Sequence, residues 1–202
     1  MTKAIGKGLV FDNVIACYIL VLPLVFLPIL SIQAKWIKPA VKVTNIYFIT
    51  LYTLLFGFTI ANIPYFNYSF THLSASVLQW FKFGNDTAGM IFQEQQFLLY
   101  LIVFFVIAFL FFAWNKYLYK RISRIEFVQE KMKFRLFVPV LLILWSACFI
   151  GIRGGWERYP IRPGAAYISN NAFYNQLGIN PMFFFIKSCS YQKKTKTIWK
   201  GY

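Results

Sequence analysis

The sequence predicts an all-α integral membrane protein with four transmembrane helices, an interfacial helix in an outer loop and a short outer linker helix. Hydrophobic residues make up 59% of the chain and charged residues only 13%, whereas a soluble domain is about half apolar and about a quarter charged. Mean hydropathy is +0.56, and four long apolar runs alternate with polar or basic loops. No early apolar run ends in a small-residue cleavage site, so the first run is predicted to be a span rather than a signal peptide.

The first predicted span covers residues 13–32, which is long enough to cross a hydrocarbon core of about 30 Å. Asp12 lies at its mouth and is interpreted as a helix-start residue, whose carboxylate opposes the positive end of the helix dipole. A direct chemical role for Asp12 is the alternative. Pro23 and Pro28 are expected to kink this helix rather than terminate it, because neighbouring groups can satisfy the freed carbonyls.

The second predicted span covers residues 43–63 and is rich in threonine and asparagine. These side chains are expected to bond the backbone or a neighbouring helix. A solute pathway is the alternative, and the lack of an ionisable residue within the run argues against it. In the following loop, 64–96, Val77, Leu78 and Phe81 fall on one helical face, which predicts a short helix lying in the membrane interface.

The third and fourth predicted spans cover residues 97–114 and 136–152. Basic residues gather in the loops 33–43 and 116–135, whereas the loop 64–96 has Lys82 as its only Lys or Arg. The positive-inside rule therefore places the two basic loops in the cytoplasm and both ends of the chain outside. An outward N-terminus without a preceding span suggests that a first helix is missing upstream.

Charge and ligand content exclude several function classes. The net charge of +15 does not indicate nucleic-acid binding, because the positive residues cluster between apolar runs. With one histidine, His72, and no CxxC motif among three cysteines, no zinc or copper site and no disulfide framework are predicted. Cys17 and Cys148 lie within apolar runs, where cysteine behaves as a small hydrophobe. No catalytic residue is predicted.

The segment 153–187, here called the exit segment, follows the last apolar run and combines turn residues, charge and aromatic side chains. Arginine can hold a lipid phosphate through two parallel hydrogen bonds, and tryptophan prefers the headgroup level. The predicted headgroup-binding residues are Arg153, Trp156, Arg158 and Arg162. The alternative is an ordinary aromatic anchor with solvated arginines. Further along, Ser169 is expected to cap a short helix that ends at Leu177 before Gly178.

Residues at both ends of the predicted bundle carry a family resemblance. The sequence Gly8-Leu9-Val10-Phe11-Asp12, followed by Tyr18 and the Leu22-Pro23 step, resembles the start of the second membrane helix in lipoteichoic acid synthase-like proteins. The stretch that joins the last membrane helix to the external catalytic domain in that family is similar to Arg153-Gly154-Gly155, Pro160-Ile161, Ala166-Tyr167-Ile168-Ser169-Asn170-Asn171, Phe173, Asn175 and Asn180-Pro181. These proteins are membrane-bound transferases of the sulfatase and alkaline phosphatase superfamily, and the resemblance covers roughly residues 7–187.

The resemblance implies a transferase that moves phosphoglycerol or phosphoethanolamine from a phospholipid to an extracytoplasmic acceptor, anchored in a bacterial cytoplasmic membrane. It implies a threonine nucleophile and a divalent metal, manganese or magnesium, in an external domain. No residue of this chain matches those positions, so no cofactor is predicted for the chain itself and the chain alone is not expected to be active. Membrane phospholipids are the expected partners, with an external domain or partner docking on the exit segment.

Three parts are therefore expected: a helix bundle at 1–152, an extracytoplasmic linker at 153–187 and a basic tail at 188–202. The tail departs from the family, and a truncated or frameshifted reading frame would explain it. A stand-alone membrane anchor or interaction protein is the alternative function. A small transporter or channel is a third reading, which the lack of charge within the spans weakens.

Overall fold

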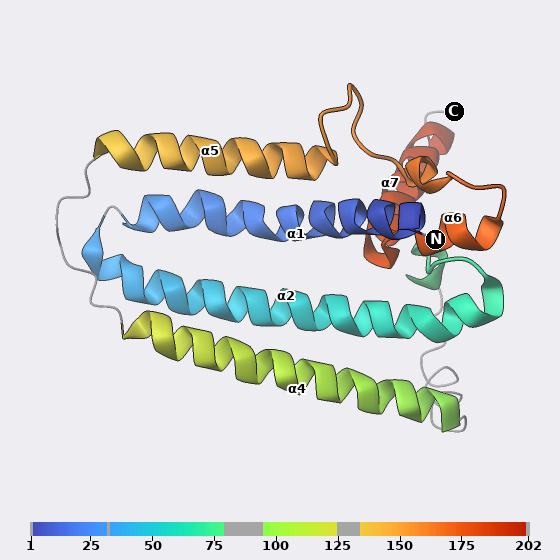
Figure 1. Ribbon diagram of the computed structural model, residues 1–202, viewed down its shortest axis with the longest axis horizontal. Coiled ribbons are helices and arrows are strands. Elements are labelled where there is room, and N and C mark those ends of the chain that lie inside the picture. Colours follow the sequence, from blue (N-terminus) through green and yellow to red (C-terminus); the bar gives the residue numbers. More distant parts are fainter. Residues whose placement is uncertain (1, 32, 79–94, 125–133, 201–202) are drawn as a thin grey trace. The chain divides into compact units, whose positions relative to one another are not determined.

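The computed structural model describes residues 2–31, 33–78, 95–124 and 134–200, and every regular element within these ranges is helical (Figure 1). In chain order the elements are α1 (Thr2–Ser31), α2 (Ala34–Ser69), α4 (Gln95–Ser123), α5 (Phe134–Arg153), the 3₁₀ helix η2 (Pro163–Ala166), α6 (Ala172–Leu177) and α7 (Pro181–Lys200). A single 3₁₀ turn at 75–78 follows α2. The all-helical prediction is thus confirmed for the described residues.

Among the described residues, three helices are long and apolar enough to cross a membrane. Their apolar stretches are Thr2–Leu30, Lys35–Ser69 and Phe97–Ser123. The apolar part of α5, Phe137–Arg153, is shorter. The structure therefore supports a membrane protein with several spanning helices, and the fourth span stays a prediction.

The basic segments that were expected to be loops are largely helical. Residues 34–42 form the first turns of α2, and α4 continues to Ser123 with Lys120 and Arg121 in its last turn. Lysine and arginine are good helix formers, and their cationic heads complement the negative end of the helix dipole in α4. The predicted loops 33–43 and 116–135 are therefore wrong over these stretches.

Asp12 is not a helix-start residue. α1 begins at Thr2 and runs through Asp12, whose carboxylate Oδ1 accepts a hydrogen bond from Nδ2 of Asn180 at 2.6 Å. Local sequence rules read a polar residue before an apolar run as a cap, but here the partner lies far along the chain. The expectation that Pro23 and Pro28 do not terminate the helix is confirmed, since α1 continues to Ser31.

The chain divides into two compact units. Unit 1 comprises Met1–Asp12, Leu55–Ile107 and Arg162–Tyr202, and unit 2 comprises Asn13–Leu54 and Ala108–Ile161. α1, α2 and α4 each run from one unit into the other.

Each unit has a small buried core. In unit 1 the fully buried rings of Phe11 and Phe183 pack with their centroids 4.8 Å apart. In unit 2 α5 runs beside α1 (Figure 1), and the Cys148 thiol points at the Cys17 carbonyl oxygen, 3.5 Å away. A β-carbon at Gly151 would clash with the Cys17 Sγ, so the close approach of α5 to α1 favours glycine at this position.

The predicted interfacial helix and the predicted basic tail are the two remaining expectations about the fold. Most of the predicted interfacial helix falls on residues 79–94, which lie outside the described residues. The predicted boundary between the linker and the basic tail does not coincide with the end of a helix, because α7 continues unbroken across residues 187 and 188 to Lys200.

Candidate lipid headgroup site

The end of α5 is fixed by two glycines in the left-handed region of φ. Gly154 has φ 82° and Gly155 φ 137°. The amide of Gly155 donates to Ile150 O at 3.2 Å, and that of Gly154 donates to Gly151 O at 3.0 Å. This is a Schellman ending, which satisfies carbonyls that the helix would otherwise leave unpaired. The chain thereby turns sharply at the end of the helix.

Arg153 organises the loop that follows. Its carbonyl oxygen accepts the amide of Ile161 at 3.0 Å, which closes the loop 154–160 at its base. Its guanidinium Nε donates to Glu157 O at 2.8 Å, and one of its terminal nitrogens donates to Arg158 O. A β-carbon at Gly154 would meet the Ile161 side chain at 2.7 Å, so the base of the loop accepts only glycine there. The loop is thus held from within by one arginine.

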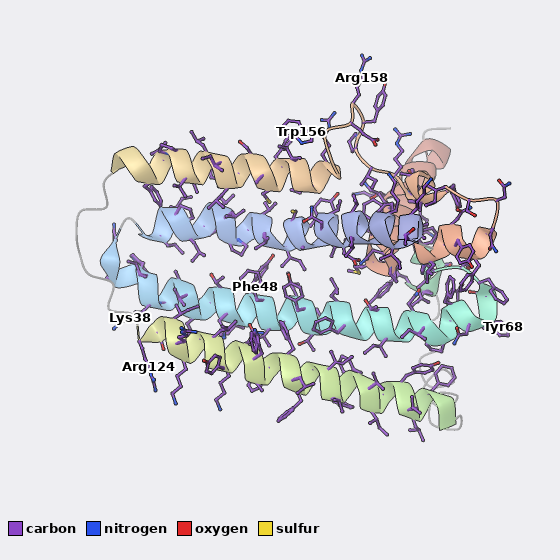
Figure 2. The ribbon with its side chains drawn as sticks, viewed as in Figure 1. Lys38, Phe48, Tyr68, Arg124, Trp156 and Arg158 are labelled. Carbon is purple, nitrogen blue, oxygen red and sulfur yellow. The ribbon has the colours of Figure 1, made fainter. Side chains whose placement is uncertain are left out.

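Three large side chains extend outward from this loop. Trp156 is 87% exposed and Tyr159 67% exposed. The Arg158 guanidinium lies 6.0 Å from the centre of the Tyr159 ring, a cation–π distance. Figure 2 shows Arg158 at the outer end of the loop and Trp156 beside the last turns of α5. In the part of unit 2 that the structure describes, neither Arg153 nor Arg158 pairs with a carboxylate.

A shallow apolar groove leads along α5 to this loop. Its volume is about 630 Å³. It is lined by Leu142, Trp145, Ser146, Phe149, Ile150, Arg153, Gly155 and Trp156. One end is therefore hydrocarbon in character, and the other end carries a positive charge and an indole ring. This is the polarity that a phospholipid presents along its length, from acyl chain to phosphate.

The four predicted headgroup residues do not all belong to one unit. Arg153, Trp156 and Arg158 lie together in unit 2, whereas Arg162 begins the last segment of unit 1. Arg162 is exposed and occupies the N-cap position of η2 with extended backbone, and its side chain makes no capping hydrogen bond. The candidate site described here consists of the first three residues.

A buried polar cluster in unit 1 holds the exit segment, and sequence reasoning did not find it. His72 Nε2 donates to the carbonyl oxygen of Gln176 at 2.9 Å, and His72 Nδ1 accepts from Asn62 Nδ2 at 3.0 Å. Asn62 Oδ1 in turn accepts the amide of Leu73 at 2.9 Å. The Phe66 ring stacks on the imidazole, with centroids 5.2 Å apart. The cluster ties α2, the segment after it and α6 together.

These partners also fix the protonation state of His72. A carbonyl can only accept, so Nε2 carries the proton, and Nδ1 must be bare to accept from Asn62. Burial lowers the pKa of His72, and the hydrogen bond to the Gln176 carbonyl opposes that effect only in part. The imidazole is therefore a neutral structural link. The one sequence signal was a lone histidine in a polar segment, with no hint of a partner 104 residues away.

Asparagines shape the rest of the exit segment. Asn175 is buried; its Oδ1 accepts the amides of Ile168 and Ser169, and its Nδ2 donates to Ser169 O. The cap of α6 is Asn171, whose Oδ1 accepts the amide of Phe173 at 2.9 Å, so the prediction of a Ser169 cap is wrong. Ser169 instead supports the turn through its Oγ, which accepts the amide of Asn171. The predicted end of this helix at Leu177 before Gly178 is confirmed.

The described residues bring no three His, Cys, Asp or Glu side chains close enough together to hold a metal ion. The three cysteines are free thiols, two of them buried. Comparison with known proteins finds no matching family model, no matching curated protein and no matching solved structure.

Proposed function

We propose that this chain is the membrane part of a lipoteichoic acid synthase-like transferase, which moves phosphoglycerol or phosphoethanolamine from a phospholipid to an acceptor outside the cell. The resemblance over residues 7–187 supplies the reaction. The chain's own task is to hold the phospholipid at the outer membrane surface, next to an external catalytic domain that carries the nucleophile and the divalent metal. The observation that carries this task is the Arg153-ordered loop at the end of the α5 groove.

The chemistry of the loop favours a phosphate over other headgroup features. Arg153 uses Nε and one terminal nitrogen within the loop, which leaves its other terminal nitrogen free to donate outward. The Arg158 guanidinium makes no hydrogen bond within the described residues and can donate two parallel bonds to a phosphate. The C-terminal end of α5 carries negative dipole potential, which Arg153 offsets for an approaching anion.

The proposed orientation follows from the distribution of cations. With four spans, the basic ends of α2 and α4 face the cytoplasm, and the loop after α5, the exit segment and both ends of the chain face outward. In a bacterial cytoplasmic membrane this places Trp156 and Tyr159 at the level of the outer headgroups, where aromatic side chains are enriched.

Lipid retention tests the headgroup role. The full chain is reconstituted in nanodiscs that contain phosphatidylcholine with a minor fraction of phosphatidylglycerol, and the lipids that stay bound after purification are counted by native mass spectrometry. Arg158→Gln should weaken retention of phosphatidylglycerol about tenfold, as for the loss of a charged hydrogen bond. Lys3→Gln removes the same charge from another exposed position and should leave retention unchanged. Equal retention in the two variants would refute the headgroup role.

The gene locus tests the family assignment. The nucleotide sequence on both sides of this reading frame should encode a sulfatase-like domain, in the same gene or beside it. An unrelated, intact neighbour would instead favour a stand-alone membrane anchor or interaction protein. A purified chain that transfers glycerol phosphate from phosphatidylglycerol by itself would contradict the division of labour proposed here.

A further inference from the structure

Unit 2 contains a second cavity, separate from the α5 groove. It has a volume of about 460 Å³, and almost no polar atom is exposed on its walls. Three helices contribute: Pro23 and Leu27 from α1, Val41 and Phe48 from α2, and Val140 and Leu144 from α5. Figure 2 shows Phe48 directed from α2 toward α1.

The helix register places this cavity at the basic end of unit 2. The Tyr52 and Phe111 rings pack 5.5 Å apart on antiparallel helices, so α2 residues before Tyr52 lie level with α4 residues after Phe111. Lys42 therefore lies level with Arg121 in the last turn of α4, and Lys38 lies about one turn further out. The cations of these two helix ends are Lys35, Lys38, Lys42, Lys116, Lys120, Arg121 and Arg124.

α1 and α5 also reach the basic end of unit 2. The indole Nε1 of Trp145 donates to Leu24 O at 3.1 Å, and the Tyr47 hydroxyl donates to Ile19 O at 2.9 Å. The Cys148–Cys17 contact lies later along α5 and earlier along α1 than the Trp145–Leu24 bond, so α5 is antiparallel to α1. α2 is also antiparallel to α1 (Figure 1), so the start of α5 and the start of α2 lie at the same end of unit 2. Among the described residues of unit 2, Glu157 is the only carboxylate, and it lies beyond the opposite end of α5.

Aromatic side chains mark the headgroup level at this end. Trp36 is 48% exposed, and the Lys35 Nζ lies 5.8 Å from the centre of its ring. On α4 the exposed rings of Trp114 and Tyr117 pack with centroids 6.3 Å apart. Tryptophan and tyrosine with adjacent lysines are typical of the boundary between hydrocarbon and headgroups. The cavity thus begins just below a cationic membrane surface.

We propose that this cavity holds one acyl chain of an anionic phospholipid, whose phosphate lies among the lysines of α2 and the cations that end α4. Water does not fill this cavity, because its walls offer no hydrogen-bond partners, whereas the acyl chains of the surrounding lipid match its apolar lining. Glu126 and Glu130 lie in the same stretch of sequence, but the ten Lys and Arg residues of 33–42 and 116–135 outnumber them. This net positive charge favours an anionic headgroup over a zwitterionic one. This site lies at the opposite end of α5 from the headgroup loop, and it does not depend on the proposed transferase function.

Charge removal tests the headgroup half of the site. In the nanodisc retention assay described above, the full chain with Lys35→Gln, Lys38→Gln and Lys42→Gln should retain phosphatidylglycerol about a hundredfold more weakly, from roughly a fivefold effect per lysine. The matched control replaces Lys3, Lys7 and Lys187 of unit 1 and should not change retention at this site. The expected result is the loss of one bound lipid that Arg158→Gln leaves in place. Equal retention in both triple variants, or equal retention of phosphatidylcholine and phosphatidylglycerol by the unchanged chain, would overturn the proposal.

Photo-crosslinking tests the acyl-chain half. Phosphatidylglycerol with a diazirine on its acyl chain should label the cavity walls in α1, α2 and α5 in the unchanged chain. Leu144→Trp fills the cavity and should reduce this labelling about tenfold, whereas Leu110→Trp, on the exposed face of α4, should not. Circular dichroism of both variants verifies that they are helical. Labelling that is spread evenly over the exposed face of α4, or that is the same in the two variants, would show that the cavity holds no lipid chain.

Discussion

Replacing Asn62 by alanine should detach the exit segment from α2 more than any other single truncation of a polar side chain. Asn62 is 4% exposed and uses both ends of its amide, one for His72 Nδ1 at 3.0 Å and one for the Leu73 amide at 2.9 Å. Alanine leaves both partners buried without a hydrogen bond. Each unsatisfied buried group costs about 1–3 kcal/mol, so the free energy of unfolding of unit 1 should fall by about 2–6 kcal/mol.

Hydrogen exchange and reversible unfolding in mixed micelles measure this effect. In Asn62→Ala the amides of Leu73 and of the α6 segment should lose protection, since the His72 link to Gln176 loses its support. Asn67→Ala is the matched control, because Asn67 lies on the same helix and, among the described residues, its side chain has a single exposed contact, 3.5 Å from the Tyr100 hydroxyl. A change in protection and unfolding free energy that is no larger in Asn62→Ala than in Asn67→Ala would refute the role of the cluster.

A charged replacement gives a sharper test of the same geometry. In Asn62→Asp the carboxylate still accepts the Leu73 amide, but it can bond His72 Nδ1 only when that nitrogen carries a proton. The aspartate should therefore raise the pKa of His72 and stabilise its charged form. Stability of this variant should rise as pH falls through the His72 pKa, opposite to the unchanged chain. A pH dependence of the same sign in both proteins would contradict the assigned tautomer.

Three further perturbations follow from single contacts. Burial lowers the pKa of His72 from an ordinary value of about 6.5, so folding stability should be full above that value and fall as pH drops below it. Thermal unfolding at pH 7 and 5.5 should show this loss, and His72→Gln should abolish it; a loss of the same size in that variant would show that His72 is not its cause. Gly154→Ala places a β-carbon 2.7 Å from the Ile161 side chain at a residue with positive φ and should cost about 1–3 kcal/mol by thermal unfolding; Gly8→Ala, in a helix with nothing within 4 Å of the new β-carbon, should not destabilise the chain, and equal costs in the two variants would contradict the loop geometry. Asn171→Ala removes the cap of α6 and should cost about 1 kcal/mol, measured as faster hydrogen exchange in that helix; Asn171→Ser retains a capping oxygen and should behave like the unchanged chain.

Local sequence patterns predicted the helices but not their ends. The apolar runs identified α1, α2, α4 and α5, because hydropathy over some twenty residues is a strong signal. Their ends depend on residues that pack far away in sequence. α1 begins at Thr2 because Ala4 and Phe11 are buried within unit 1, where the Ala4 backbone lies within 3.7 Å of a β-carbon placed at Gly178.

The sequence named the residues of the candidate site, whose role in headgroup binding stays a prediction, but it did not predict how the loop that carries them is built. Arg153, Trp156 and Arg158 were identified because arginine and tryptophan beside a membrane helix are typical of headgroup contact. The sequence did not predict that the Arg153 guanidinium donates to two loop carbonyls. This arrangement depends on the positive φ angles that Gly154 and Gly155 allow. The structural role of His72 was not predicted for a different reason. Its partners, Asn62 and Gln176, come from segments that only the fold brings together.

α7, the last helix of the described chain, is hydrogen-bonded to α1, the first helix. Asn180 donates from Nδ2 to the Asp12 carboxylate at 2.6 Å, and its Oδ1 accepts the amide of Phe183 at 3.0 Å, so one side chain both caps α7 and ties it to α1. Ser188 adds a bond to the amide of Ala75, after α2. A group docked on α7 is therefore coupled through hydrogen bonds to α1 and to the segment that follows α2. For the proposed transferase, this coupling would hold an external domain in a fixed position over the membrane, which a catalytic site working on a bound headgroup requires.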